Sequence, residues 1–256
     1  MIKKHLITCS VMIVLVVISV LTVSNTSAKK PAVIASTLRP FPTKFVFTEA
    51  KTTDDYSFAN EAIPVNDKHV DHKLRRTLIQ HDYHNVQSNI LQIKADKWFP
   101  IIEPILKAYG IPDDFKYIPL VESGLCCGKS PKGAYGIWQF MPGTARTYGL
   151  KVGHGHDERL NISKSTIAAC KYIKELYAQF NSWTLAAAAY NNGEIKLQHQ
   201  INKQNEDNYF RMHLNHETGM YVYKLIAMKE IISKPADYGY KTVCAVVPTH
   251  EWQAYN

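Results

Sequence analysis

The hydrophobic and polar positions of this chain recur mainly with helical spacing. From Val86 onward, apolar residues return at mixed helical intervals until Tyr109 and Gly110 interrupt them, and Pro100 and Pro104 predict a break into two helices. An acidic first turn after Pro112 predicts the start of the next helix. Further helices are predicted at 138–148, 163–180, 183–191 and 217–232. The pattern therefore predicts a mainly α fold.

The segments on either side of this region carry a weaker apolar signal. Residues 29–85 have prolines scattered among polar residues, which predicts a linker or N-terminal segment. Residues 236–256 are predicted to form a C-terminal tail, with a short apolar run at 243–247 that fits a strand or a surface segment. The folded domain is therefore expected to span 86–235.

Residues 1–28 have the pattern of an export signal. Lys3 and Lys4 precede an uncharged stretch from Leu6 to Val23, and small residues follow it up to Ala28. A stretch of about 18 residues is at the lower limit for a membrane span. A cleaved signal peptide and a retained membrane anchor are therefore both open, and either places the protein in the periplasm or cell envelope.

Composition indicates a globular domain with a basic surface. The chain has 256 residues, of which 46% are hydrophobic and 20% charged, enough for one domain with a substantial core. Its formal charge of +8 falls by two if Lys3 and Lys4 are removed with a signal. A basic surface attracts polyanions. No concentrated Lys/Arg block or nucleic-acid motif is present, so nucleic acid is not expected as a partner.

Glu122 is the strongest candidate for chemistry. It ends an apolar run and shares the inner side of its predicted helix with Phe115 and Ile118. Among such neighbours a carboxylate loses hydration, so its pKa should rise and the acid form should persist near neutral pH. A protonated carboxyl of this kind can protonate a leaving oxygen.

Four motifs surround this glutamate in the sequence. They are IPLVESG at 118–124, GIWQFMPGTA at 136–145, AAYNNG at 188–193 and ETGMYVYK at 217–224. Together, over about 95–233, they resemble the soluble lytic transglycosylase (SLT) family, and within it the membrane-bound type D subgroup. Departures from the family pattern are Asn192 and Gly124, where Ala is usual, and the pair Cys126 and Cys127. The LysM repeats common in that subgroup are not found in this sequence.

The resemblance implies a goose-type lysozyme-like helical domain with a substrate groove. It also implies cleavage of the β-1,4 bond between N-acetylmuramic acid and N-acetylglucosamine without water. Glu122 would first protonate the glycosidic oxygen and then, as the carboxylate, deprotonate the muramoyl C6 hydroxyl, which gives a 1,6-anhydro product. Peptidoglycan strands, with their peptide carboxylates, are the expected partner, and a retained N-terminal segment would add membrane association.

Six further residues are candidate substrate contacts on the family pattern: Ser123, Gln139, Met141, Tyr190, Asn191 and Tyr221. Gln139 offers a donor and an acceptor to sugar groups. Tyr190 is expected to hydrogen-bond Glu122 or the sugar, and Tyr221 to donate to Glu122. Met141 and Tyr221 could equally be core residues, because apolar and aromatic side chains at helical spacing usually pack inside.

Two other functions are carried as alternatives. Asp157 is the best candidate for a second catalytic carboxylate, which would make the protein a hydrolytic lysozyme-type muramidase. A non-catalytic peptidoglycan-binding protein is the second alternative, although such a protein would be expected to lose its acid first.

No cofactor or metal is expected. Three histidine pairs at i, i+3 spacing lack the cysteine or carboxylate framework of a structural zinc site. Four cysteines remain after removal of a signal, namely Cys126, Cys127, Cys170 and Cys244. A disulfide from the loop after Glu122 to Cys170 or Cys244 and buried free thiols are both compatible with the sequence.

Overall fold

The structure, a computed structural model, describes residues 56–153 and 155–241. The prediction of a mainly α fold is confirmed, since two-residue hairpin strands are the only sheet in the described part. No helix among these residues is long and apolar enough to cross a membrane. The predicted export segment and the run at 243–247 lie outside the described residues.

The elements follow one another as α2 (Lys68–His81), α3 (Tyr83–Val86), α4 (Ile90–Ala108), the 3₁₀ helix η3 (Asp113–Tyr117), α5 (Ile118–Ser123), α6 (Pro142–Thr147), the 3₁₀ helix η4 (Glu158–Leu160), α7 (Ile162–Phe180), α8 (Trp183–Asn192), α9 (Glu194–Gln204), α10 (His216–Ser233) and the 3₁₀ helix η5 (Pro235–Tyr238). Two antiparallel hairpins accompany them, β1 (Ser57–Phe58) with β2 (Glu61–Ala62) and β3 (Val152–Gly153) with β4 (His156–Asp157).

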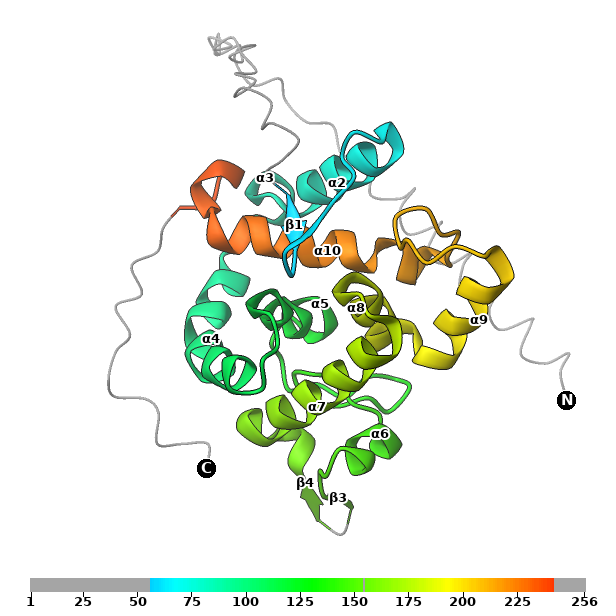
Figure 1. Cartoon of the computed structure of the whole chain (residues 1–256). Helices are drawn as coiled ribbons and strands as arrows, with labels where there is room; N and C mark the ends of the chain where they lie inside the picture. The colour runs from blue at the N-terminus through cyan, green and yellow to red at the C-terminus, as the bar shows by residue number, and fades with distance from the viewer. Residues whose placement is uncertain (1–55, 154, 242–256) are drawn as a thin grey trace, which may run out of the picture. The chain divides into compact units, whose positions relative to one another are not determined.

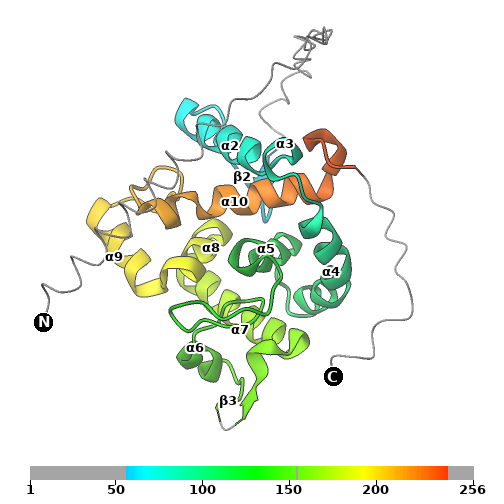
Figure 2. The ribbon, with the colours of Figure 1, turned by 180° about the vertical axis from the view of Figure 1, so that it is seen from behind.

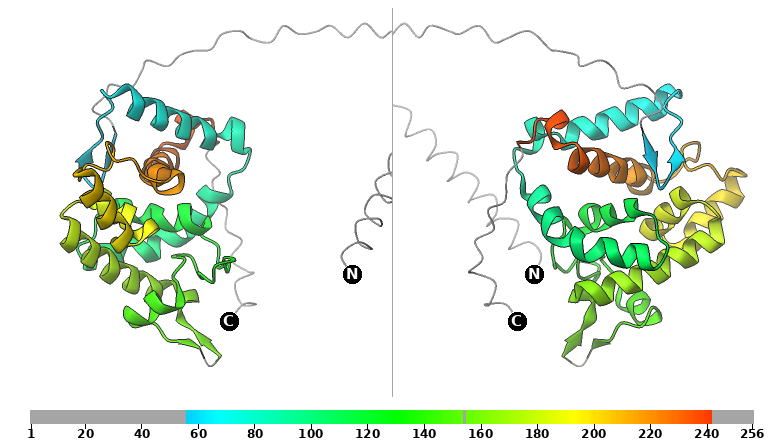
Figure 3. Two further views of the ribbon diagram at one scale, coloured as in Figure 1. Left: turned by 90° about the vertical axis from the view of Figure 1, so that its right-hand side faces the viewer. Right: turned by 60° about the vertical axis from the view of Figure 1, so that its left-hand side comes forward.

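Helix α10 is the central element of the domain. It runs between α2 on one side and α5 and α8 on the other (Figures 1 and 2). Its buried residues, among them Val222, Leu225 and Ile226, occur on nearly all sides of the helix, as is typical of a helix enclosed by the core. Below it, helix α7 packs against both α4 and α8 and so connects these two helices (Figure 3).

Folded structure begins earlier than the predicted start at residue 86. The second half of the segment that we expected to be a linker contains the β1–β2 hairpin and α2, and it contributes Phe58 and Leu74 to the core, both fully buried. At the other end, Tyr240 is also buried and donates to the carbonyl of His81 at 2.6 Å. The apolar positions of 56–85 are few but well placed, which explains why their periodicity gave little signal.

The hairpin also caps the helix that carries the third motif. The carboxylate of Glu61, on β2, accepts hydrogen bonds from the backbone amides of Trp183 and Thr184 at 2.6 and 2.9 Å. These amides are unpaired donors at the start of α8, where an anion is favoured by the helix dipole. A residue 122 positions away along the chain therefore fixes where α8 begins.

The predicted break in the helix after residue 86 is wrong. Helix α4 is continuous from Ile90 to Ala108, with Pro100 and Pro104 inside it. Both prolines are exposed, as is Asp96, whose carbonyl loses its usual donor at Pro100. Water can satisfy carbonyls on this outer face, so the helix continues while its inner face buries Phe99, Ile102 and Leu106.

Candidate active site

Glu122 lies near the end of α5, a short helix that follows the 3₁₀ turn η3 without a break. Gly124 ends α5 in the left-handed conformation, with φ of 58°, and its amide donates to the carbonyl of Leu120. Glycine adopts this cap without the steric cost that a Cβ would bring. Lys94, on α4, holds the same turn by donating to the Gly124 carbonyl at 3.0 Å.

The Glu122 carboxyl is held by Tyr221, on α10. The Tyr221 hydroxyl donates to Glu122 Oε1 at 2.6 Å, as the sequence pattern predicted. Burial raises the pKa of Glu122 above its usual value, and the negative charge of Glu217 acts in the same direction. The hydrogen bond from Tyr221 and the charge of Lys224 oppose that rise in pKa. The result is a carboxyl that keeps its proton at higher pH than an ordinary glutamate.

Tyr190 does not hydrogen-bond Glu122, which was one of the two partners expected for it, the other being the sugar. Its hydroxyl donates to the backbone carbonyl of Trp138 at 2.8 Å, whereas the donor to Glu122 is Tyr221. The Tyr190 ring packs edge-on against Trp138 and Phe140 and tilted against Tyr172. Burial, followed by the nearby Glu122 charge, raises the pKa of Tyr190 well above its ordinary value, so Tyr190 is a neutral support for the second motif.

Ser123 also has a supporting contact in this structure. Its hydroxyl donates towards the carbonyls of Pro119 at 3.0 Å and Ile137 at 2.9 Å. The second of these bonds links the glutamate helix directly to the GIWQF segment. Ser123 therefore fixes the position of Glu122 relative to the loop that carries Gln139.

Gln139 lies in a strained turn of that loop. Its φ is 49°, an uncommon value for a residue with a Cβ, and its side-chain amide donates to the carbonyls of Gly128 and Gly136 at 3.0 and 2.8 Å. No described residue donates to its side-chain carbonyl oxygen, which leaves an acceptor for a ligand. Backbone strain of this kind clusters at functional sites.

The apolar pair after Gln139 separates into one core residue and one surface residue. Phe140 is buried, whereas Met141 is 44% exposed and precedes Pro142 at the start of α6. An exposed methionine beside the candidate site is available for contact with a sugar face. For Met141 the core interpretation is therefore wrong.

Asn191 connects α8 to the start of α10. Its side-chain oxygen accepts from the Thr218 hydroxyl at 3.0 Å, and its amide donates to Glu217 at 3.3 Å. Sequence reasoning placed Glu217 and Thr218 only within the fourth motif. Their adjacency to Asn191, together with the effect of Glu217 on the pKa of Glu122, adds them to the site. The signal that could have found them is the acid that opens the predicted helix at 217.

Asp157 has a structural partner that argues against its proposed catalytic role. Its two oxygens accept from the guanidinium of buried Arg159 at 2.8 and 2.6 Å, which lowers the pKa of Asp157. Arg159 in turn donates to the carbonyls of Gly133 and Phe140, both at 3.0 Å. Asp157 therefore balances a buried cation that holds the 133–140 loop in place.

The cysteines in the described residues are all free thiols. Cys126 and Cys127 are exposed, whereas Cys170 is buried in α7, so the pairing of this loop with Cys170 is not formed. Burial raises the pKa of the Cys170 thiol to about 12, as expected for an unreactive core cysteine. Cys244 lies outside the described residues. No cluster of three or more His, Cys, Asp or Glu side chains that could hold a metal occurs within 56–153 and 155–241.

Known proteins are similar to this chain in sequence. Residues 100–212 match the family model described as the transglycosylase SLT domain. Membrane-bound lytic murein transglycosylase D of Escherichia coli K12 is 31% identical over 186 residues, which cover 69% of this chain and 39% of that protein. Peptidoglycan transglycosylase gp16 of Escherichia phage T7 is 42% identical over 71 residues, which cover 27% of this chain and 5% of that protein.

Among solved structures, the 70 kDa soluble lytic transglycosylase of Escherichia coli aligns with a TM-score of 0.44 and 20% identity, covering 61% of this chain and 28% of that one. The family match runs from within α4 to the segment after α9 and includes Glu122, Gln139 and Asn191, while Tyr221 lies beyond it on α10. Residues 100–212 of this chain therefore form a transglycosylase SLT domain.

Proposed function

We propose that this protein is an exported peptidoglycan lytic transglycosylase, which cleaves the β-1,4 bond between N-acetylmuramic acid and N-acetylglucosamine and leaves a 1,6-anhydromuramoyl end. The observation that carries the proposal is the partly buried carboxyl of Glu122, whose pKa is raised and whose Oε1 accepts from Tyr221 at 2.6 Å. The E. coli relative is named as a membrane-bound murein transglycosylase, which supports a location in the cell envelope.

In the first step, protonated Glu122 donates its proton to the glycosidic oxygen as the bond breaks. Burial raises the pKa of Glu122, so this carboxyl keeps its proton to a higher pH than an ordinary glutamate does. The acetamido group of the substrate would stabilise the positive charge that develops on the muramoyl ring. Gln139, whose side-chain carbonyl oxygen accepts from no described residue, and exposed Met141 would orient that sugar.

In the second step, the Glu122 carboxylate removes the proton of the muramoyl C6 hydroxyl, and that oxygen closes the ring. The Tyr221 hydroxyl favours the carboxylate form that this step requires. One glutamate can thus act in both steps because each step leaves it in the form needed for the other. The pairing of Asp157 with Arg159 weakens the case for a two-carboxylate hydrolase.

The test is mass spectrometry of the soluble products after the purified protein has digested peptidoglycan. We expect muropeptides lighter by one water than the corresponding reducing sugars, and none from Glu122→Gln, because an amide cannot donate the proton. Asp96→Asn, which removes an exposed carboxylate of α4, should behave as wild type.

Two results would contradict the proposal. Reducing ends in the wild-type digest would indicate a hydrolase, with Glu217 as the carboxylate to test next, since its charge already raises the pKa of Glu122. No released products from folded wild-type protein would indicate a binding protein.

A further inference from the structure

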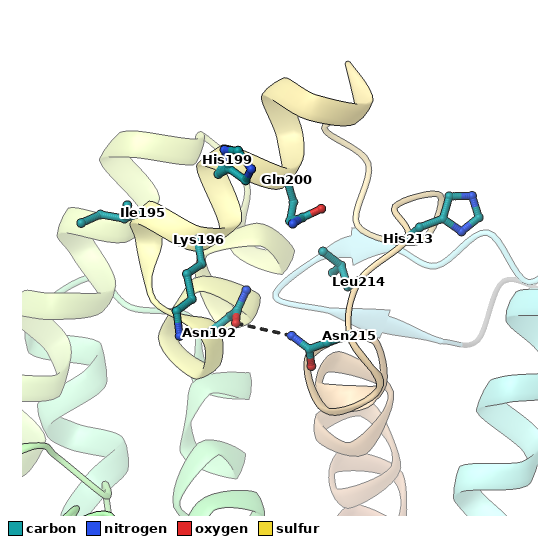
Figure 4. Close-up of a pocket in the computed structure, with 8 residues that line it drawn as sticks. All are labelled: Asn192, Ile195, Lys196, His199, Gln200, His213, Leu214 and Asn215. Carbon is teal, nitrogen blue, oxygen red and sulfur yellow. Dashed lines mark hydrogen bonds between the residues drawn. The ribbon is translucent and has the colours of Figure 1, made fainter.

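A cavity lies beside the candidate active site, between α9 and the loop before α10 (Figure 4). Its volume is about 450 Å³, enough for several amino-acid side chains. Lys196 and His199 project from α9, and Leu214 and Asn215 come from the facing loop. The loop is held by Gln204, whose side chain pairs with both the amide and the carbonyl of His213, at 2.7 and 3.0 Å.

The cavity and the site share a wall. Asn192 lines the cavity and directly follows Asn191, whose side chain contacts Glu217 and Thr218. Across the cavity, the Asn215 amide donates to the Asn192 oxygen at 3.5 Å and to the Thr218 hydroxyl at 3.0 Å. The cavity therefore adjoins the Asn191–Glu217 pair of the candidate site.

The lining of the cavity is cationic and contains no acid. Lys196 extends towards Asn192 (Figure 4), and it has no ion-pair partner among the residues that the structure describes. Glu194 and Glu217, the acids nearest in sequence to the lining, are engaged with Tyr172 at 3.2 Å and Asn191 at 3.3 Å respectively. The ammonium of Lys196 and the imidazole of His199 are thus free to donate to an anion.

One lining residue sets this chain apart from the family pattern. Asn192 stands where alanine is usual, and its side-chain oxygen is the group that receives the Asn215 amide. An alanine there could not form this contact across the cavity. The polar contact across the cavity therefore depends on the side chain of Asn192.

We propose that this cavity binds a carboxylate of the peptide carried by a muramoyl residue next to the cleaved bond. The proposal rests on the proposed function, because it takes the occupant to be part of the same peptidoglycan strand. Each muramoyl unit can bear an acidic peptide, and such a peptide complements the Lys196 ammonium. The apolar side chains of Leu214 and of Ile195, which is 79% exposed, suit the small apolar residues of such a peptide. The enzyme is then selective for glycan that retains its peptides.

The first experiment compares kcat/KM on peptide-bearing peptidoglycan with kcat/KM on the same glycan after its peptides have been removed by an amidase. For Lys196→Glu we expect a loss of about tenfold or more on the peptide-bearing substrate, mainly in KM, since a charge-assisted hydrogen bond is removed and a repulsive charge added. On stripped glycan the variant should match wild type. Asn192→Ala should lower kcat/KM only on the peptide-bearing substrate, and by a smaller factor than Lys196→Glu does.

The matched control is Lys203→Glu, which makes the same charge reversal in the last turn of α9 but outside the cavity. Lys203→Glu should leave kcat/KM unchanged on both the peptide-bearing and the stripped glycan. Equal losses for Lys196→Glu on the two substrates, or an equal loss for Lys203→Glu, would overturn the proposal, because the effect would then come from the sugar or from long-range charge.

The second experiment separates this proposal from the proposed function. The full-length Glu122→Gln protein is titrated with a soluble N-acetylmuramoyl peptide, and binding is measured by calorimetry with and without Lys196→Glu. Binding that Lys196→Glu weakens about tenfold supports the cavity even if the wild type cleaves nothing. Binding that Lys196→Glu leaves unchanged, or no binding to folded protein, overturns it even if the wild type is an active transglycosylase.

Discussion

At the scale of single residues, the site divides into a glutamate that can exchange a proton and neighbours that set its charge. Tyr221 is the neighbour in direct contact, and its hydroxyl lowers a pKa that burial alone would raise further. Burial and the Tyr221 hydrogen bond thus shift the pKa of Glu122 in opposite directions. Removal of the hydroxyl should therefore raise this pKa.

Tyr221→Phe should raise the pKa of Glu122 beyond its wild-type value. The basic limb of the pH profile of kcat/KM should move to higher pH, since the acid form persists longer. At the same time kcat should fall by about tenfold, because the carboxylate needed in the second step loses a hydrogen bond to a charged acceptor. The profile is measured by product release across pH.

Tyr209→Phe is the matched control for this change. Tyr209 is also a buried tyrosine, but its hydroxyl donates to the carbonyl of Thr218 at 2.7 Å and not to Glu122. The pH profile of kcat/KM for Tyr209→Phe should have its acidic and basic limbs at the same pH as in the wild type. A Tyr221→Phe profile whose basic limb stays in place or moves to lower pH would contradict the assigned role.

Asp157→Asn tests the other carboxylate that the sequence singled out. At temperatures well below the melting temperature, we expect kcat to stay within about twofold of wild type. The free energy of unfolding should fall by about 1–2 kcal/mol, because the substitution weakens an ion pair with the buried cation Arg159. Thermal unfolding and product release measured on the same preparation check both halves. A loss of activity as deep as that of Glu122→Gln would restore Asp157 to the chemistry.

At the scale of elements, the conformation of the loop after α5 depends on the close contact between Gly136 and the backbone of Arg159. Gly136 has a φ of 78°, and a Cβ at this position would lie 2.0 Å from the carbonyl oxygen of Arg159. That carbonyl is backbone beside a buried guanidinium, so it cannot easily move. The position therefore requires glycine for space as well as for conformation.

Gly136→Ala should lower the free energy of unfolding by more than about 3 kcal/mol or prevent folding, because the clash adds to the strain of a left-handed residue. Gly133→Ala is the control, since Gly133 has a φ of 90° but a Cβ there would meet no atom within 4 Å. It should cost only the conformational part, about 1–2 kcal/mol. Denaturant unfolding compares the two, and equal losses would show that the Arg159 contact is unimportant.

The elements that the sequence predicted well are those whose signal is local. The periodic stretch at 163–180 became α7, and its N-cap is Asn161, whose oxygen accepts from the Lys164 amide. The stretch predicted at 138–148 became only α6 (Pro142–Thr147), because Gln139 turns back to donate to the carbonyl of Gly136 and Arg159 holds the carbonyl of Phe140. That turn depends on a residue from a distant part of the chain, which periodicity cannot reveal.

The same distinction separates the parts of the site. Glu122, Gln139, Asn191 and Tyr221 were found from motifs, and the bond between Tyr221 and Glu122 agrees with the expected one. The partner of Tyr190 was not predictable, because two tyrosines competed for one carboxyl and only packing decides between them. Glu61 at the start of α8 carried no signal, since the contact spans 122 positions.

At the scale of the whole molecule, Glu122 links catalysis to stability through its proton. Between the ordinary pKa of a glutamate and its raised pKa in the folded state, the folded protein binds more protons than the unfolded one. Stability therefore falls as pH rises through that window and stays lower above it. Groups whose pKa is lowered in the fold, such as Asp157 and Glu158, act in the opposite direction at more acidic pH.

Comparing Glu122→Gln with wild type isolates the contribution of Glu122, because every other titrating group is common to both proteins. The difference in melting temperature, variant minus wild type, should be small at acidic pH, where the wild-type carboxyl is protonated. It should then increase from the ordinary pKa of a glutamate up to the raised pKa of Glu122 and level off above it, since only the wild type bears an ionised, partly buried carboxylate. Thermal unfolding measured below about pH 9 keeps tyrosine ionisation out of the comparison. A difference that does not vary with pH would mean that Glu122 is solvated like an ordinary surface acid. If the pH at which the increase levels off coincides with the basic limb of kcat/KM, the group that destabilises the fold when it ionises is also the acid whose proton the reaction uses.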